Sequence, residues 1–193
     1  MKVGLTGGIG CGKSTVAGIF KDSGWNTMES DKIVAELLAG DLEVHAALRE
    51  HWGRAVFSET GQVNRRAVAD RVFQDEDELI WLEQLLHPRV RKVWQEAVRA
   101  APGSNWLVEI PLIFEKRLET AFDLVVCIAS SPAVVEIRMA ARGYTGEEVE
   151  RRRHRQMPLD EKMRLADHVI TNSGSLEFLE HQTTRLIRQI SVA

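Results

Sequence analysis

Residues 7–15 of the chain read GGIGCGKST. They match the pattern G-x-x-x-x-G-K-[ST], whose fixed positions fall here on Gly7, Gly12, Lys13 and Ser14. A short apolar run ends just before the stretch and apolar residues at helical spacing follow it, so the glycines occupy a strand-to-helix turn. Such a turn directs backbone N–H groups inward at the positive end of a helix, where they can bind phosphate. The stretch predicts a phosphate-binding loop; the alternative is a glycine-rich turn with an incidental Lys-Ser pair.

The side chains of this loop favour a nucleoside triphosphate with Mg²⁺ as the ligand. Lys13 can reach the β- and γ-phosphates, and the hydroxyl of Ser14 is placed to bind the metal. Cys11 is expected to be a small residue in a loop that binds through its backbone. The predicted nucleotide contacts of the loop are Gly8, Gly10, Cys11, Gly12, Lys13, Ser14 and Thr15.

Outward from the loop, short apolar runs alternate with longer amphipathic stretches, which is typical of an α/β fold. Five runs are apolar and short enough to be strands buried between helical layers. They are residues 2–6, 25–28, 106–110, 124–128 and 168–171. The sequence therefore predicts a five-stranded parallel sheet.

Local signals also predict where several helices begin and end. Ser131 before Pro132 starts one helix, and Thr145 with Glu148 three residues later starts another. Two further helices are expected to end at glycines, Gly24 and Gly53.

The strand signal disappears between about residues 41 and 101, where apolar residues recur at helical spacing. This stretch is expected to be a helical insertion in a single domain. Within it, two interpretations of His87 remain open. His87 either closes one helix as Pro88 opens the next, or it contacts an acceptor substrate.

Composition and charge limit the class of protein. Of the 193 residues, 44% are hydrophobic and 27% are charged, as in ordinary globular proteins. The net charge of -3 argues against non-specific binding of nucleic acid. No apolar run approaches the roughly 20 residues needed to span a bilayer, and the first residues lack the pattern of a secretory signal. The two cysteines, Cys11 and Cys127, are too few for a disulfide framework and form no metal-binding pattern, so we expect a reducing, cytoplasmic setting.

A carboxylate follows the second predicted strand. Asp31 lies where the ends of parallel strands open onto the ligand crevice, and it is the leading candidate to accept the proton of an attacking hydroxyl group. The alternative is that Asp31 or Ser30 only caps the following helix. Position alone does not separate these interpretations.

Arginines gather between residues 136 and 164, where eight basic residues stand against six acidic ones. Small-molecule kinases close an arginine-bearing flap over the phosphates to neutralise charge and exclude water. Only some of these arginines are expected to take this catalytic role. Others, including Arg153, follow glutamates at the spacing of solvent-facing helix pairs.

Taken together, these segments resemble the dephospho-coenzyme A (dephospho-CoA) kinase family over nearly the whole chain. The segments that carry the resemblance are residues 5–15, 31–34, 87–88, 110–115 and 166–172, with Arg138, Arg142, Arg152, Gln156 and Lys162 between them. The resemblance implies an adenylate-kinase-like core, a helical acceptor region and a lid at about residues 141–162. It implies ATP, Mg²⁺ and dephospho-CoA as ligands, with the phosphoryl group passing to the ribose 3′-hydroxyl. Among the clustered arginines, it implies the catalytic lid role for Arg142 and Arg152.

The resemblance also suggests residues on the substrate side. His87, Pro111 and Leu112 are expected to border the acceptor, and Asn172 to contact adenine, although residues 172–174 could instead cap a helix near Ser175.

Four positions depart from the usual pattern of the family: Cys11, Glu29, Ala35 and Gly143. The alternatives are another nucleoside or nucleoside-monophosphate kinase, and a nucleotide switch, for which the sequence lacks an Asn-Lys-x-Asp segment. The sequence does not predict the oligomeric state.

Overall fold

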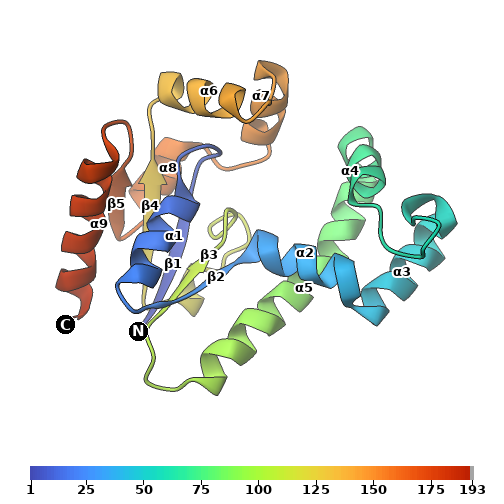
Figure 1. Cartoon of the computed structure of the whole chain (residues 1–193), viewed down its shortest axis with the longest axis horizontal. Coiled ribbons are helices and arrows are strands. Elements are labelled where there is room, and N and C mark those ends of the chain that lie inside the picture. Colours follow the sequence, from blue (N-terminus) through green and yellow to red (C-terminus); the bar gives the residue numbers. More distant parts are fainter. Residues whose placement is uncertain (192–193) are drawn as a thin grey trace. The chain divides into compact units, whose positions relative to one another are not determined.

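Five strands form one parallel sheet in the order β2-β3-β1-β4-β5 in the computed structural model, which describes residues 1–191 (Figure 1). The strands are β1 (Lys2–Gly7), β2 (Asn26–Glu29), β3 (Trp106–Glu109), β4 (Leu124–Ala129) and β5 (His168–Thr171). This confirms the predicted five-stranded sheet, with strand ends shifted by no more than one residue.

The chain forms two compact units. The first combines Met1–Glu29 with the chain from Pro102 onward and contains the sheet. Its helices are α1 (Lys13–Asp22), α6 (Pro132–Ala141), α7 (Gly146–His154), α8 (Leu159–Leu165) and α9 (Leu176–Ser191), with a short 3₁₀ turn, η2 (Glu119–Ala121). Side chains from β1, β4, α1 and α9 form its apolar core. The strands are apolar because helices cover both faces of a parallel sheet.

The second unit, Ser30–Ala101, is helical in every element that the structure assigns to it. Its elements are α2 (Ser30–Gly40), α3 (Leu42–Trp52), the 3₁₀ turn η1 (Gly53–Val56), α4 (Arg65–Gln74) and α5 (Glu76–Ala100). It begins earlier than the helical stretch expected from about residue 41, because α2 packs against α3 and α5.

The predicted helix boundaries follow local chemistry. Thr145 and Glu148 form a complete capping box at the start of α7. Ser131 is the N-cap of α6, with Pro132 in its first turn. Gly24 follows the end of α1 and Gly53 ends α3, both with positive φ angles of 86° and 66°. These four predictions are confirmed.

The interpretation of His87 as the end of a helix is wrong. Helix α5 runs without interruption from Glu76 to Ala100 and contains Pro88. Proline cannot donate a hydrogen bond to the carbonyl four residues earlier, which usually bends or ends a helix. Here the apolar face of α5 is buried on both sides of the proline, at Leu86 and Val90, so tertiary packing outweighs the local preference.

Candidate nucleotide and acceptor site

The phosphate-binding loop joins β1 to α1 in a conformation that requires glycine at two places. Gly7 has φ 149°, and a Cβ atom there would overlap the carbonyl oxygen of Ile128 on the neighbouring strand β4. Gly12 has φ 96°, and a Cβ atom there would overlap the side-chain amide of Asn172. Both backbone conformation and close packing therefore exclude larger residues.

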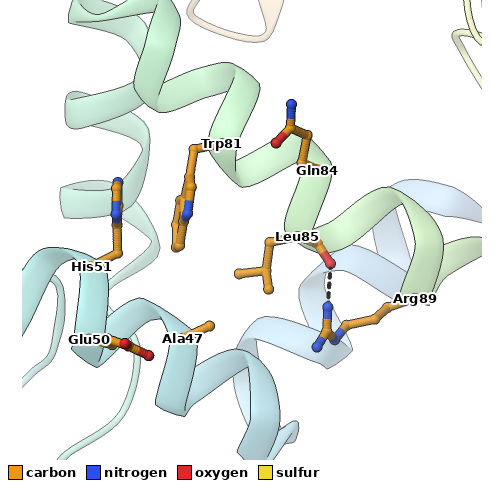
Figure 2. A pocket seen from close by; sticks show the side chains of 7 residues that line it. All are labelled: Ala47, Glu50, His51, Trp81, Gln84, Leu85 and Arg89. Atoms are coloured by element: carbon orange, nitrogen blue, oxygen red, sulfur yellow. Dashed lines mark hydrogen bonds between the residues drawn. The ribbon is translucent and has the colours of Figure 1, made fainter.

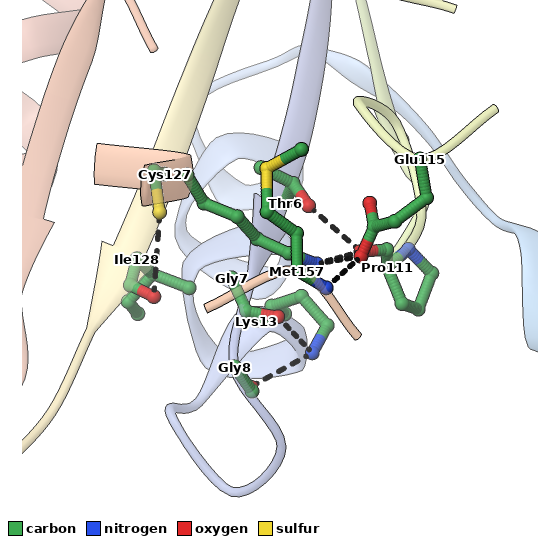
Figure 3. A network of polar contacts seen from close by, with 10 residues as sticks. Thr6, Gly7, Gly8, Lys13, Pro111, Glu115, Cys127, Ile128 and Met157 are labelled. Atoms are coloured by element: carbon green, nitrogen blue, oxygen red, sulfur yellow. Dashed lines mark hydrogen bonds and ion pairs between the residues drawn. The ribbon is translucent and has the colours of Figure 1, made fainter. Parts of the chain in front are cut away.

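Lys13 begins α1 and folds back over this loop. Its Nζ atom donates hydrogen bonds to the carbonyl oxygens of Gly7, at 3.3 Å, and Gly8, at 3.2 Å (Figure 3). Ser14 and Thr15 follow in the first turn of α1, and both are exposed. The structure thus places a cation and a hydroxyl group at the same end of the helix, as phosphate and metal binding require.

A polar network supports the loop from behind. The Asn172 Nδ2 atom donates to the Cys11 carbonyl at 2.9 Å, and the Asn172 Oδ1 atom accepts from Arg138 at 3.1 Å. Ser130 donates to the Asn172 carbonyl at 2.7 Å and accepts from Arg138 at 3.1 Å. Both ends of the Asn172 side chain are therefore engaged within the protein, where they fix the loop. The expected adenine contact stays a prediction.

The two cysteines are free and buried. The Cys11 side chain belongs to the apolar core, so this residue can offer a ligand only its backbone. Burial raises the pKa of the Cys127 thiol to about 11, with a smaller effect from Cys11. Cys127 is therefore protonated at neutral pH, as expected for a core residue.

Sequence reasoning missed one carboxylate beside the loop. Glu109 is the last residue of β3, and its Cα position pairs with Leu5 of β1 and with Glu29 of β2. Its side chain is buried at the carboxyl-terminal end of the strands, where β1 leads into the loop. In the sequence, residues 106–110 indicate only an apolar strand and do not single out Glu109. Its position beside the loop depends on the register of the neighbouring strands, which the local sequence does not show.

Asp31 and His87 belong to the helical unit. Asp31 is exposed in the first turn of α2, two residues after β2 ends. It lies inside the helix rather than at the N-cap position, so the capping interpretation of this residue is not supported. His87 lies in the middle of α5 and is half-buried.

The helical unit contains a hollow of about 600 Å³ between α3 and α5 (Figure 2). The ring of His51 stacks on Trp81, with centroids 3.8 Å apart and planes 11° from parallel, and forms one wall. Arg89 donates to the Leu85 carbonyl at 2.8 Å. The lining residues are Ala47, Glu50, His51, Trp81, Gln84, Leu85 and Arg89. The hollow thus combines a flat aromatic wall with polar groups.

A hydrogen-bonded carboxylate lies next to this hollow. Glu78 accepts hydrogen bonds from His51 at 2.6 Å and from Trp52 at 2.9 Å. The hydrogen bond from His51, followed by that from Trp52, holds the pKa of the Glu78 carboxyl below its usual value.

Pro111 and Leu112, the two expected acceptor contacts of the first unit, follow β3 directly. Both are half-buried. The carbonyl oxygen of Pro111 accepts hydrogen bonds from Thr6 at 3.0 Å and from Lys162 at 2.6 Å. This carbonyl is therefore committed to internal contacts, and the expected acceptor contacts of Pro111 and Leu112 stay a prediction.

The expected lid contains the end of α6, all of α7 and the start of α8. Arg142 is the exposed C-cap of α6, and Arg152 on α7 places its guanidinium carbon 4.9 Å from the centre of the Tyr144 ring. Arg153 forms an ion pair with Glu150 at 3.0 Å, as expected for a surface pair. The hydrogen bonds from Thr145 lower the pKa of Glu148 in the capping box at the start of α7.

Within residues 1–191, no helix is both long and apolar enough to cross a membrane. The same residues contain no group of three His, Cys, Asp or Glu side chains that could hold a metal ion. A metal bound mainly by phosphate oxygens and one hydroxyl group does not need such a group.

The parallel sheet, the glycine-constrained loop and the lysine over it define a P-loop nucleotide-binding protein. The family model described as dephospho-CoA kinase matches residues 1–177. The chain belongs to the dephospho-CoA kinase family.

Two proteins named dephospho-CoA kinase and one further solved structure are similar to the chain over nearly its full length. A dephospho-CoA kinase of Bacillus licheniformis is 37% identical, over 96% of this chain and 94% of its own length. A solved structure from Thermus thermophilus is 34% identical with a TM-score of 0.83, covering 98% of this chain and 97% of the other. The dephospho-CoA kinase structure from Campylobacter jejuni has 25% identity, a TM-score of 0.72 and coverage of 99% and 98%.

Proposed function

We propose that this chain transfers the γ-phosphoryl group of ATP to the ribose 3′-hydroxyl of dephospho-CoA, giving coenzyme A and ADP. The observation that carries the proposal is a phosphate-binding loop with Lys13 over it, in a chain whose relatives match it over nearly its full length. The predicted five-stranded P-loop fold, the kinase activity and the family agree with the comparisons.

The proposed chemistry is an in-line displacement. The ribose oxygen forms a bond to the γ-phosphorus while the bond from that phosphorus to the bridging oxygen of ADP breaks. Asp31 accepts the proton of the hydroxyl group as it attacks. Lys13 neutralises charge on the β- and γ-phosphates, and Arg142 and Arg152 add positive charge when the lid closes.

Ser14 fits the expected Mg²⁺ because it offers an exposed oxygen ligand in the first turn of α1. Glu109, at the adjacent strand end, is our candidate for a ligand that acts through water. When bound, Mg²⁺ supplies charge neutralisation between the phosphates.

The hollow between α3 and α5 is our candidate for part of the acceptor subsite. An uncharged chain with amide groups fits an aromatic wall, Leu85 and the polar groups of Gln84 and Arg89. His87, Pro111 and Leu112 remain proposed acceptor contacts, and Asn172 remains a proposed contact of the nucleotide. Two buried free cysteines accord with the proposed cytoplasmic location.

The test is an assay of ADP formation with and without dephospho-CoA, followed by analysis of the phosphorylated position. Nucleosides and nucleoside monophosphates serve as comparison acceptors. We expect ADP formation to depend on dephospho-CoA and the new phosphate to lie on the ribose 3′-oxygen. Phosphate at another position, or equal turnover of a comparison acceptor, would contradict the proposal.

A further inference from the structure

A fully buried ammonium group lies in the first unit. Lys162, on α8, has a side-chain exposure of 0%, and its Nζ atom lies 2.8 Å from Glu115 Oε1. The same Nζ atom donates to the Pro111 carbonyl at 2.6 Å. Glu115 and Pro111 both belong to the segment that follows β3 (Figure 3).

Stability alone is a weak explanation for this pair. Removing two charges from water offsets much of their attraction, and apolar residues of similar size often stabilise a protein as well or better. A buried ion pair does supply fixed geometry, because either charge is strongly unfavourable without its partner. The groups that the pair holds in place therefore indicate what the pair does.

The pair joins three parts of the proposed active site. Glu115 Oε1 also accepts the backbone N–H of Met157 at 2.8 Å, between α7 and α8 near the end of the expected lid, and Lys162 itself is the last residue of that lid. The Pro111 carbonyl also accepts from Thr6, the residue just before the phosphate-binding loop. One carboxylate and one carbonyl thus connect the lid end, the segment after β3 and the strand that carries the loop.

Lys162 supplies most of the interactions that compensate the buried negative charge of Glu115. Its Oε2 atom is buried and has no hydrogen-bond partner among residues 1–191. Without the ammonium group, the carboxylate would retain only the Met157 N–H among the contacts described above. Loss of Lys162 should therefore release the carboxylate from its position and loosen the end of the lid.

We propose that Lys162 and Glu115 are positioning residues that anchor the C-terminal end of the lid. The anchor determines where the arginines on the lid arrive when it closes, and it keeps the Pro111 segment in register with the phosphate-binding loop. This inference rests on the proposed kinase function. It predicts that variants of the pair still bind ATP but align it poorly and admit water to the site.

The test compares Lys162→Met, Glu115→Gln and the double variant Lys162→Met/Glu115→Leu. We expect kcat to fall about 10- to 100-fold in Lys162→Met and in the double variant. ATP affinity should change by no more than about twofold, and ADP formed per coenzyme A formed should rise above one. Glu115→Gln keeps an acceptor for Met157 and should lose less activity than the double variant.

Ile190→Ala is the control for lost stability, since Ile190 is buried on α9 outside this cluster. It should lower the melting temperature without changing the ratio of ADP to coenzyme A. The double variant removes both charges together. If it regains normal stability, turnover and product ratio, the pair only fills the core and the proposal is wrong.

A measurement on the unmodified enzyme covers the case in which the variants fail to fold. The Met157 amide should be protected from hydrogen exchange, because it donates to a buried carboxylate. Exchange as fast as that of the exposed Gly146 amide would overturn the anchor. Failure of the kinase assignment is distinct, because the unmodified enzyme would then form no coenzyme A.

Discussion

Lys13 supplies the mobile positive charge of the phosphate-binding loop, whereas the backbone and its glycines shape the cradle. Lys13→Ala should reduce turnover by about 10²-fold or more, because charge moving onto the β- and γ-phosphates would lose its counter-ion. The melting temperature should change little. Steady-state kinetics and thermal unfolding on one preparation would check this, and full activity in the variant would remove Lys13 from the mechanism.

The proposed role of Asp31 as the proton acceptor can also be tested with one substitution. Asp31→Asn keeps the shape of the side chain but removes the proton acceptor, and loss of a general base commonly lowers the rate by about 10²- to 10⁴-fold. ATP binding should barely change. A variant with near-normal turnover and slightly lower stability would show that Asp31 serves only the first turn of α2.

The lid arginines at the end of α6 and on α7 can be tested by substitution. If Arg142 and Arg152 reach the phosphates only after closure, replacing either with glutamine should lower the single-turnover rate by about 10²-fold and leave ATP affinity nearly unchanged. Arg153→Gln is the matched control, because Arg153 is paired with Glu150 on the surface. Its loss should lower helix stability by at most about 0.5 kcal/mol.

The contact between Arg152 and Tyr144 needs its own control. Tyr144→Leu removes the aromatic ring but keeps the guanidinium group, so it should retain much more activity than Arg152→Gln. Equal kinetics in the Arg142, Arg152 and Arg153 variants would contradict the division into lid and surface arginines, while the kinase family would be unaffected.

The proposed acceptor subsite between α3 and α5 can be tested by substituting Trp81. Trp81→Ala removes the aromatic wall of the hollow and should raise the KM for dephospho-CoA by up to about tenfold, with little change in the KM for ATP. Ile80→Ala is the matched control, since Ile80 is the exposed neighbour on α5 and does not line the hollow. A normal KM in Trp81→Ala would remove the hollow from the acceptor subsite.

The stability of the whole molecule should depend on pH through Glu78. Its pKa is lower in the folded protein than the usual 4.5, so the folded state favours the ionised carboxylate. The resulting stabilisation is present above about pH 4.5 and is lost as the pH falls through the folded-state pKa. The difference in unfolding free energy between the unmodified enzyme and Glu78→Gln should therefore shrink on acidification. A constant difference from pH 7 to pH 3 would contradict this assignment.

Across the whole molecule, the predictable features are those encoded by neighbouring residues. The loop of residues 7–15, the five strands and the capping box at Thr145 each depend on a few consecutive positions, and the structure contains them. Local chemistry is sufficient there because glycine, a cap residue or an apolar run restricts the backbone directly. The roles of Asp31, Arg142 and Arg152 remain predictions, since local sequence does not establish where a mobile side chain meets a substrate.

The sequence by itself determined the P-loop, the class of fold and the resemblance to the family, because each is carried by residue types at fixed spacing. Only the tertiary structure decided that α5 continues through Pro88, that Glu109 ends β3 beside the loop, and that Lys162 is buried against Glu115. Lys162 and the Pro111 carbonyl that it contacts are 51 positions apart in the chain. Contacts of this kind depend on how distant segments pack, and no local propensity or motif spacing specifies that packing.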